Sequence, residues 1–522
     1  MSAAPSLPTP APATAPTPFS LRLAVGLLGI LLASMVAGLN GRVPGLVLAD
    51  LRGAMGLSMD SASWLTTAYS AGELSAMPFA TWFAITYSLR RFHLSMLFIT
   101  LGISAVLPLV QNLHVLLVLR LFHGMLGGAL IPILMMASLR FLPTPIRLHG
   151  LAIFSLVATF SPNIALWLAA VWVNHLEDWR WVYWHVIPLG MLAAGMVAWG
   201  IPKLPVALPR LKQANWLGLL LGMPGLMLMV VCLDQGVRLD WLNSPIIAAS
   251  LLLGSVLCAL FLISEWRHPT PFVRLQLLGR RNIGVNLMCC AVLLMAMASS
   301  AALPPIFLGM THGFLMEQSY PLGLLIGFPQ LIIAPCVAIL LYQRWGDARH
   351  VFALGLALMS TACWMASDLT QEWMVSQFIG PTLLQAVGQP LAMIALLFLT
   401  TSAVQPMEGP FLAGLFNIVR VVSATAGGAV INQLLSVRGH FHTEALFDAA
   451  GSALPRLGLP DSTFDTLGNT LAEQATVLAT ADTYRLFGVL VLLLIPVVLW
   501  LNYIPPPMVE RKAPAALAPA VS

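Results

Sequence analysis

The sequence predicts an all-α integral membrane protein with fourteen spanning helices, on three observations. Of its 522 residues, 59% are hydrophobic and only 9% are charged, whereas soluble domains carry about 25% charged residues. The apolar residues gather in windows of about 20 residues, the length that a helix needs to cross a bilayer. Lysine and arginine fall between these windows and form no basic face. In lipid only helices of this length satisfy every backbone group, so the spans are helical.

The apolar windows fall into groups of six, two and six. The first group lies near 21–48, 61–86, 93–111, 114–138, 148–172 and 180–201. An inserted pair lies near 214–232 and 245–264. The last group lies near 284–309, 320–343, 350–367, 374–402, 408–436 and 482–504. Transporters built from repeated halves place their site near the membrane midplane between the halves, so this pattern indicates a two-lobed transporter.

The segments outside the apolar windows complete the predicted domains. Residues 1–20 are rich in Ala, Pro, Ser and Thr and form a disordered cytoplasmic tail. The six-helix halves are 21–201 and 284–505, joined by a linker, 202–283, that holds the inserted pair. A polar external loop, 437–480, belongs to the second half and is either an ordered cap or a docking surface; a cytoplasmic tail, 506–522, ends the chain. A cleaved signal peptide is not expected, because the first apolar run is too long.

The basic residues orient the chain. With a cytoplasmic N-terminus, sixteen of the 25 Lys and Arg residues face the cytoplasm and six face the other side. Positive charge marks the cytoplasmic side of a membrane protein, so both termini are predicted inside. The remaining three, Arg42, Arg120 and Arg420, lie within spans. The net charge of +5 therefore reflects orientation and not a nucleic-acid partner.

Glu73 is the only acidic side chain that we place well inside a span. Ionisable residues within a membrane are functional candidates by default. Desolvation disfavours the charged form of a carboxyl group, so Glu73 can bind a proton on one side and release it on the other. Arg42 lies about 10 Å further toward the outside by helix rise, and a Glu73–Arg42 pair is expected. The alternatives are a purely structural ion pair or a glutamate that faces water.

Polar residues in three other spans are further candidates. Arg120 precedes Gly124 and Gly128, a spacing that lets two helices approach closely. Arg420 is the only deeply placed charge of the second half, and either a substrate anion or a structural tie explains it. Gln385 and Gln389 add polar lining beside Pro390, where a helix is expected to kink.

No enzyme signature is present in the sequence. A phosphate-binding glycine loop with lysine is absent, and so is a nucleophile–base pair. The six cysteines lack metal-ligand spacing. We therefore expect a protein that is not an enzyme, with no catalytic residue, no metal and no cofactor.

Motifs in several spans resemble those of a known family. Arg120, His123 and Gly124 are followed by Gly128 and Ile131-Pro132, and the segment WRWVYWHVIPLG spans 179–190. Together with Arg420 and the small residues after it, these motifs resemble the major facilitator superfamily, in its fourteen-span drug:proton antiporter family (EmrB/QacA type). The likeness runs from about residue 21 to about residue 505. It implies two halves that rock around a central cavity and a role for Arg120 in proton transfer.

The sequence also departs from this family. Asn40 stands where the family usually carries an acidic residue in span 1. Thr81 and Ile85 replace a glycine and a charged residue in the motif after span 2. We therefore hypothesise that Glu73 supplies the missing carboxylate from the neighbouring helix.

These observations predict a secondary active transporter in a bacterial inner membrane that exports amphiphilic or aromatic compounds in exchange for protons. The predicted proton-coupling residues are Glu73 and Arg120, and the predicted substrate-binding residues are Arg42, Asn40, Arg420, Gln385 and Gln389. Its partners are then the small-molecule substrate, protons and membrane lipid, and the resemblance adds a periplasmic adaptor and an outer-membrane channel. One alternative is a dedicated organic-anion or siderophore carrier, in which Arg42 and Arg420 hold the carboxylate. The other is a receptor or assembly protein that has lost transport.

Overall fold

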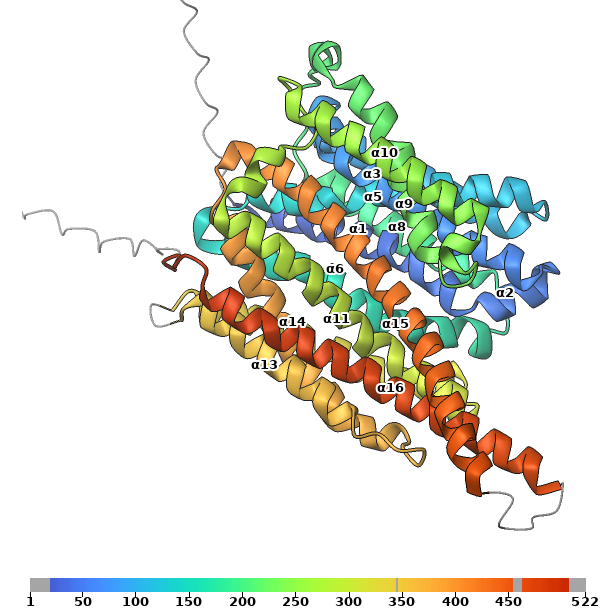
Figure 1. Cartoon of the computed structure of the whole chain (residues 1–522). Coiled ribbons are helices and arrows are strands. Elements are labelled where there is room, and N and C mark those ends of the chain that lie inside the picture. Colours follow the sequence, from blue (N-terminus) through green and yellow to red (C-terminus); the bar gives the residue numbers. More distant parts are fainter. Residues whose placement is uncertain (1–18, 344–345, 454–461, 507–522) are drawn as a thin grey trace, which may run out of the picture.

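The computed structural model describes residues 19–343, 346–453 and 462–506, and within these ranges it contains helices and no strand (Figure 1). A first group of helices comprises α1 (Leu21–Leu46), α2 (Leu48–Met55), α3 (Met59–Thr86), α4 (Leu89–Val106), α5 (Leu113–Phe141), α6 (Thr144–Ala170), α7 (Trp181–Trp184) and α8 (Val186–Gly200). An inserted pair follows, α9 (Trp216–Gln235) and α10 (Pro245–Arg267). The second group comprises α11 (Arg281–His312), α12 (Met316–Leu341), α13 (Ala348–Ala366), α14 (Val375–Thr401), α15 (Gly409–Ala453) and α16 (Ser462–Leu499). The predicted all-α membrane fold is confirmed, and a helix stands at each predicted window.

Twelve helices in the described part of the chain are long and apolar enough to cross a membrane. α3 and α13, which occupy the second and eleventh predicted spans, are not among these twelve. α3 carries Asp60, Glu73 and a run of Ser and Thr, and α13 carries Arg349 and His350 in its first turn, which lower the mean hydropathy of both helices. Both helices are nevertheless packed within the bundle, α3 against α5 and α13 against α14. The count of fourteen spans therefore stays a prediction.

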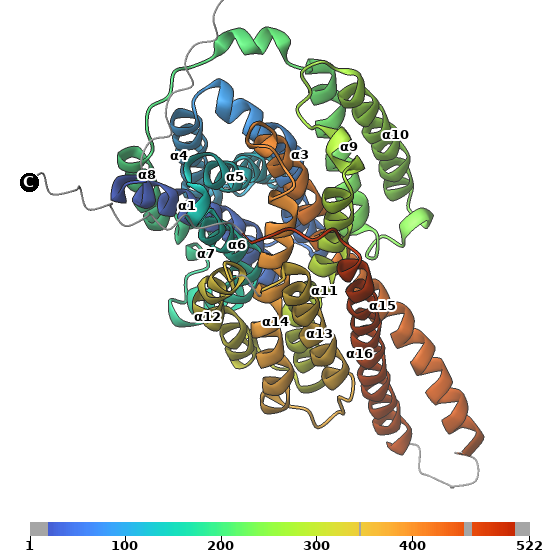
Figure 2. The same ribbon diagram turned by 90° about the vertical axis from the view of Figure 1, so that its left-hand side faces the viewer.

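The structure describes most of the segment 437–480, which the sequence predicts to be an external loop; its position outside the membrane stays a prediction. α15 continues to Ala453 and α16 begins at Ser462, so both sides of this segment are helical. Figure 2 shows the ends of α15 and α16 projecting together from the bundle. Arg438 Nε donates to Asp482 Oδ2 at 2.7 Å and ties the two helices. The prolines of the segment lie only between 454 and 461, so no proline interrupts the described helices on either side.

Close contact between α3 and α5 depends on glycine. A Cβ atom added to Gly124 would lie 2.0 Å from the Tyr69 carbonyl oxygen, and one added to Gly128 would lie 2.2 Å from that of Glu73. A Cβ on Gly72 would likewise meet the Leu121 oxygen at 2.1 Å. Only glycine permits such an approach of two helix backbones. The predicted packing role of Gly124 and Gly128 is confirmed, and it fixes the turn of α3 that carries Glu73.

The two groups meet along α6, which packs against α12 and α14, and along α15, which packs against α3 and α5. Both described chain ends lie at one end of the bundle, which we call the terminal end, and α2 lies at the opposite end, the α2 end (Figure 1). At the terminal end Thr81 Oγ1 donates to the Pro410 carbonyl at 3.0 Å, and the Leu148 amide donates to Tyr342 Oη at 3.2 Å. These hydrogen bonds join the two groups there.

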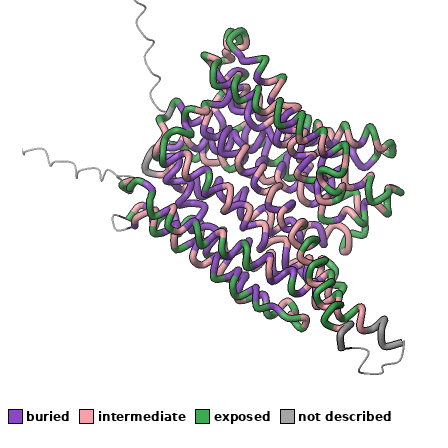
Figure 3. The backbone as a smooth tube through the Cα atoms, in the orientation of Figure 1, coloured by how far each residue is buried: buried purple, intermediate pink, exposed green. Residues whose placement is uncertain are grey.

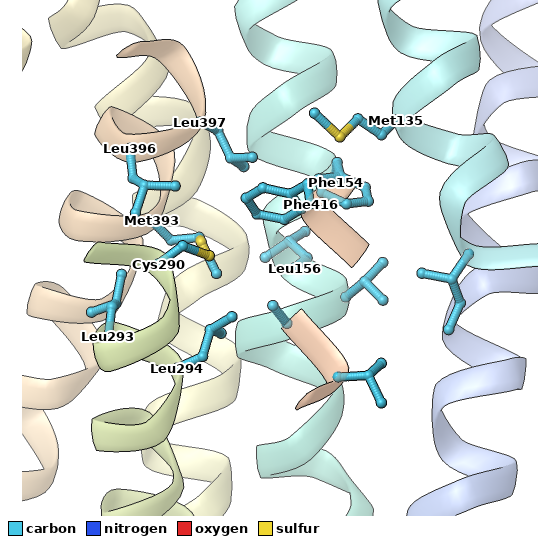
Figure 4. Close-up of a cluster of buried hydrophobic side chains, with 14 of the residues drawn as sticks. Met135, Phe154, Leu156, Cys290, Leu293, Leu294, Met393, Leu396, Leu397 and Phe416 are labelled. Atoms are coloured by element: carbon cyan, nitrogen blue, oxygen red, sulfur yellow. The ribbon is translucent and has the colours of Figure 1, made fainter. Parts of the chain in front are cut away.

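An apolar layer fills the bundle between its middle and the terminal end. Figure 4 shows Phe154 of α6 against Phe416 of α15, with side chains of α5, α11 and α14 around them. The two rings meet edge to face with centroids 5.8 Å apart. Figure 3 shows that buried residues concentrate in the middle of the bundle and exposed ones at its ends and outer faces. The layer therefore closes the space between the groups on the terminal side.

The inserted pair lies against the first group. At the terminal end Phe272, which follows α10, packs on Phe79 and Trp82 of α3, with ring centroids 4.9 and 5.1 Å apart. At the α2 end Gln235 Nε2 donates to the Ser63 carbonyl at the start of α3. α10 packs mainly on α9 and leaves large apolar side chains exposed, among them Ile246, Leu252, Leu253, Val256, Leu260, Leu262 and Ile263. An exposed apolar face of this kind suits contact with lipid.

Candidate functional site

A cavity of ≈ 370 Å³ lies between the two groups of helices. Residues of α1, α3, α6, α9, α11, α14 and α15 line it, and many are Gly or Ala, whose small size leaves the space open. Its charged lining residues are Arg42, Glu73, Asp234 and Arg420. The lining reaches toward the α2 end through Val237 and Asn432, while Leu294 belongs to the cluster of Figure 4 that closes the terminal side.

Glu73 forms an ion pair across the cavity with Arg420. Arg420 Nη2 lies 3.5 Å from Glu73 Oε1, and the two side chains are 6% and 15% exposed. Arg420 Nε donates to Asn417 Oδ1 at 3.1 Å, one turn earlier on α15, which orients the guanidinium. Nη2 makes no hydrogen bond although it is buried. The pair therefore joins α3 of the first group to α15 of the second.

Arg42 is not the ion-pair partner of Glu73, contrary to the expected pair. It lines the same cavity from α1, and its buried Nη1 atom has no hydrogen-bond partner. Helix rise along α1 and α3 alone favoured Arg42 as the partner, but the packing of α15 against α3 brings Arg420 closer to Glu73. A buried donor without a partner is unfavourable by about 1–3 kcal/mol. Arg42 is therefore a donor that a ligand group would satisfy.

The other three predicted substrate-binding residues differ in whether they line the cavity. Gln389 lines the cavity, accepts from Gln330 Nε2 at 2.9 Å and donates to Ser300 Oγ at 2.8 Å. Gln385 is buried one turn away and accepts from Gln389 at 3.4 Å, outside the lining. Asn40 is also buried outside the lining, and neither atom of its side-chain amide has a partner. Of these three, only Gln389 lines the cavity.

Arg120 lies away from the cavity, enclosed between α1, α3 and α5. Its side chain is fully buried; Nη1 donates to the Asn40 carbonyl at 3.2 Å and Nε to the Leu65 carbonyl at 3.3 Å. The guanidinium carbon lies 4.5 Å from the centre of the Tyr69 ring, a favourable cation–π position. Tyr69 in turn donates to the Ala37 carbonyl at 2.6 Å. The surroundings of Arg120 are those of a tie between helices.

Asp234 is a cavity carboxylate that the sequence analysis missed. It lies in the last turn of α9, beyond the predicted window that ended at 232, and it accepts a hydrogen bond from the Thr67 hydroxyl. Acidic residues at helix ends usually face water, so the sequence carries little signal for this position. A polar run on the neighbouring helix, at 60–70 of α3, is the one available hint.

Among the described residues, no three His, Cys, Asp or Glu side chains group in a way that could hold a metal ion. The site instead consists of two carboxylates, two guanidiniums and three amides around a space of small side chains. Chemically, such a cavity can bind a small molecule with polar and apolar parts and can exchange a proton at a carboxylate.

The sequence profile described as the Major Facilitator Superfamily matches residues 30–428. The chain belongs to this superfamily. The human organic anion transporter MFSD10 (TETRAN) has a similar crystal structure, with a TM-score of 0.55, 13% identity and coverage of 90% of this chain and 99% of that one. The superfamily fold that the sequence predicted is therefore confirmed.

Curated relatives cover most of the chain at low identity. The colistin resistance protein EmrB of Acinetobacter baumannii is 25% identical, over 74% of this chain and 75% of its own. The fatty acid resistance protein FarB of Neisseria gonorrhoeae is 22% identical over 90% and 94%, and the multidrug export protein EmrB of Escherichia coli K12 is 20% identical over 88% and 90%. The predicted resemblance to the EmrB type is confirmed. This superfamily member is a membrane transporter, and its relatives support the prediction of efflux.

Proposed function

We propose that this transporter exports amphiphilic or aromatic compounds in exchange for protons, with Glu73 as the proton-binding group. The observation that carries the proposal is the Glu73–Arg420 ion pair, which lines the cavity and joins the two groups of helices. Protonation of Glu73 removes one charge of this pair. It therefore changes both the charge of the cavity and a contact between α3 and α15.

The predicted topology indicates from which side of the membrane protons reach Glu73. If the terminal end is cytoplasmic, the cavity faces the outside, because the apolar layer closes its other side. A proton from outside then binds Glu73 and weakens its attraction to Arg420. Rocking of the two groups breaks the Thr81–Pro410 and Leu148–Tyr342 hydrogen bonds and exposes the cavity to the cytoplasm. There Glu73 releases the proton, cargo enters, and the loaded protein returns.

The names of the relatives support the class of cargo. They refer to colistin, to fatty acids and to multiple drugs, and fatty acids combine an apolar body with a polar group. Since these relatives are bacterial, we place the transporter in a bacterial inner membrane with both termini in the cytoplasm. A periplasmic adaptor and an outer-membrane channel are its proposed partners. Binding of a periplasmic adaptor protein to the projecting ends of α15 and α16 would support the proposed partnership.

Transport by purified protein in proteoliposomes tests the proposal. With an imposed pH gradient, Glu73→Gln should abolish proton-driven movement of ethidium while the protein still elutes as a single folded species. Glu444→Gln, an exposed glutamate on the projecting part of α15, is the matched control and should behave as wild type. Unchanged proton-driven transport in Glu73→Gln would remove Glu73 from the mechanism. If the wild-type protein moves no solute, a receptor or assembly role replaces transport.

The organic-anion carrier remains a second candidate because two guanidiniums line the cavity. Arg42 Nη1 and Arg420 Nη2 are both buried without a hydrogen-bond partner, as expected of donors kept for a carboxylate. In this case Arg42→Gln should weaken binding of benzoate much more than binding of benzamide. Equal effects on the two probes would exclude a carboxylate at Arg42.

A further inference from the structure

Asp234 differs from the other charged residues of the cavity in its origin and in its partners. It belongs to α9, one of the two inserted helices, and not to either six-helix group. Its side chain is exposed, and since it lines the cavity, the carboxylate is accessible from there. Within the described residues it takes part in no ion pair. Glu73, by contrast, already has Arg420 as its partner.

The carboxylate of Asp234 keeps most of its capacity to bind. A carboxylate offers about four lone-pair positions, and the Thr67 hydroxyl is its hydrogen-bond donor here. A cationic group that comes within about 4 Å of this carboxylate is attracted to it. A positively charged group in the cavity would therefore find its favourable position beside Asp234, because Arg42 and Arg420 repel it elsewhere.

A chain of hydrogen bonds holds Asp234 in position from both groups of helices. Beside it, Gln235 Nε2 donates to Thr67 Oγ1 and to the Ser63 carbonyl, and its Oε1 accepts from Arg238 Nε at 2.6 Å. Arg238 Nη1 in turn binds Asp60 Oδ1 at 2.6 Å. On the other side Trp241 Nε1 donates to Gln433 Oε1 of α15 at 2.7 Å. The end of α9 is thus fixed against α3 and α15, and its carboxylate is preorganised for a ligand.

The apolar lining residues of the same cavity suit an apolar body. Leu233 and Val237 flank Asp234 on the inserted segment, and Leu294 and Met297 of α11 line the same cavity. The volume of ≈ 370 Å³ is within the range of sites for small molecules, about 300–1,000 Å³. A ligand with an apolar body and one positive charge therefore matches both the walls and the free carboxylate.

We propose that Asp234 binds the positively charged group of organic cations, and that the inserted pair of helices thereby contributes directly to cargo selection. This inference rests on the proposed function, since it names a cargo class and a selectivity residue for the same cavity. The inserted pair then acts as a third part of the binding site besides the two rocking groups. Neutral cargo uses the same walls without the contribution of Asp234.

Equilibrium binding of two radiolabelled probes to the purified full-length protein tests the proposal. The probes are tetraphenylphosphonium, a cation, and triphenylphosphine oxide, a neutral compound of similar shape. Asp234→Asn removes the charge and keeps an oxygen that can accept from Thr67. We expect it to weaken tetraphenylphosphonium binding about tenfold, equivalent to about 1.4 kcal/mol, and to leave the neutral probe within about twofold. Asp234→Glu should restore the preference for the cation.

A control variant separates charge in the cavity from charge elsewhere on the inserted segment. Asp240→Asn removes an exposed carboxylate that lies outside the cavity lining, and should leave the affinities of both probes within about twofold of wild type. Equal weakening of both probes by Asp234→Asn, no weakening of either, or failure of the wild-type protein to bind tetraphenylphosphonium would overturn the inference. Failure of the proposed function is distinct from these outcomes, because it is measured as loss of pH-driven transport. Cation binding that depends on Asp234 would survive such a failure.

Discussion

Two buried arginines, Arg120 in the first group of helices and Arg420 in the second, occupy opposite kinds of surroundings. Arg120 is fully buried beneath Tyr69 and donates to two main-chain carbonyls. Arg420 is 5% exposed, borders the cavity, and has a terminal nitrogen that forms an ion pair but no hydrogen bond. Close contact of α3 and α5 at their glycines encloses the region around Arg120, whereas the region around Arg420 opens onto the cavity.

This difference distinguishes an arginine with a structural role, Arg120, from one that a ligand in the cavity can reach, Arg420. In the sequence both residues are single arginines within an apolar span, and both were candidates for function. A charged group in hydrocarbon needs partners, and each arginine has some but not all of them, since Nη2 of both residues is buried without a hydrogen bond. Arg120 contacts main-chain carbonyls and no carboxylate, whereas Arg420 is paired with Glu73 and lines the cavity. We infer that access to the cavity, and not depth in the membrane, identifies the arginine that can take part in transport.

The largest effect on stability is expected for a substitution that forces α3 and α5 apart. Gly128→Val places side-chain carbon where even a Cβ atom would lie 2.2 Å from the Glu73 carbonyl oxygen, so α3 and α5 must separate. Overpacking of this kind destabilises by about 3 kcal/mol, which should remove most folded protein in a size-exclusion and thermal-unfolding assay. Gly102→Ala on α4 is the control, since a Cβ there meets nothing within 4 Å. A Gly128→Val protein as stable as wild type would show that this crossing is not close.

A pair of matched substitutions tests the comparison of the two arginines. Arg120→Leu removes the donors of two carbonyls in the closed region and should lower stability by about 2 kcal/mol. Arg420→Leu should change stability less but reduce pH-driven transport at least about tenfold, because Glu73 loses its partner. Thermal unfolding and transport are measured on the same preparations. If Arg120→Leu keeps normal stability and loses proton coupling, the family-based role of Arg120 in proton transfer is supported and the comparison fails.

The smallest effect is expected at an arginine outside the bundle core. Arg280 donates from two nitrogens to Glu408, at 2.7 and 2.8 Å, and these hydrogen bonds hold the pKa of Glu408 below its ordinary value. Because the pKa in the folded state is depressed, the pair stabilises the protein above the ordinary pKa, and this contribution is lost as pH falls through the lowered value. Arg280→Gln should therefore lower stability at pH 7 by less than about 1 kcal/mol. The difference from wild type should vanish on acidification, and a difference that grows instead would contradict this assignment.

The helices were predictable because lipid leaves the backbone no alternative. The windows at 374–402 and 350–367 correspond to α14 and α13 within a few residues. The helical form of the projecting ends of α15 and α16 was not predicted, because a polar sequence fits a loop and a solvated helix equally well. Within 437–480 the prolines all lie in 454–461.

The cavity was predictable only in part. Burial of a carboxyl marked Glu73, and its position in the lining follows from the packing of α3. Its partner was not predictable, since 347 positions separate Glu73 from Arg420 and helix rise favoured the nearer Arg42. Asp234 was missed for another reason: a carboxylate in the last turn of a helix has the same local pattern whether it faces solvent or a cavity. The roles of all these residues in transport stay predictions.

The unbroken length of α15 has a mechanical consequence. This helix of 45 residues begins at the terminal end, passes the cavity at Arg420 and continues to Ala453 outside the bundle. From Arg420 to its far end it extends about 50 Å at 1.5 Å per residue, so a tilt of about 10° displaces the tip by about 9 Å. A small rotation of α15 near Glu73 therefore produces a large displacement at its far end. A fluorophore attached to that end would report conformational changes of the transporter.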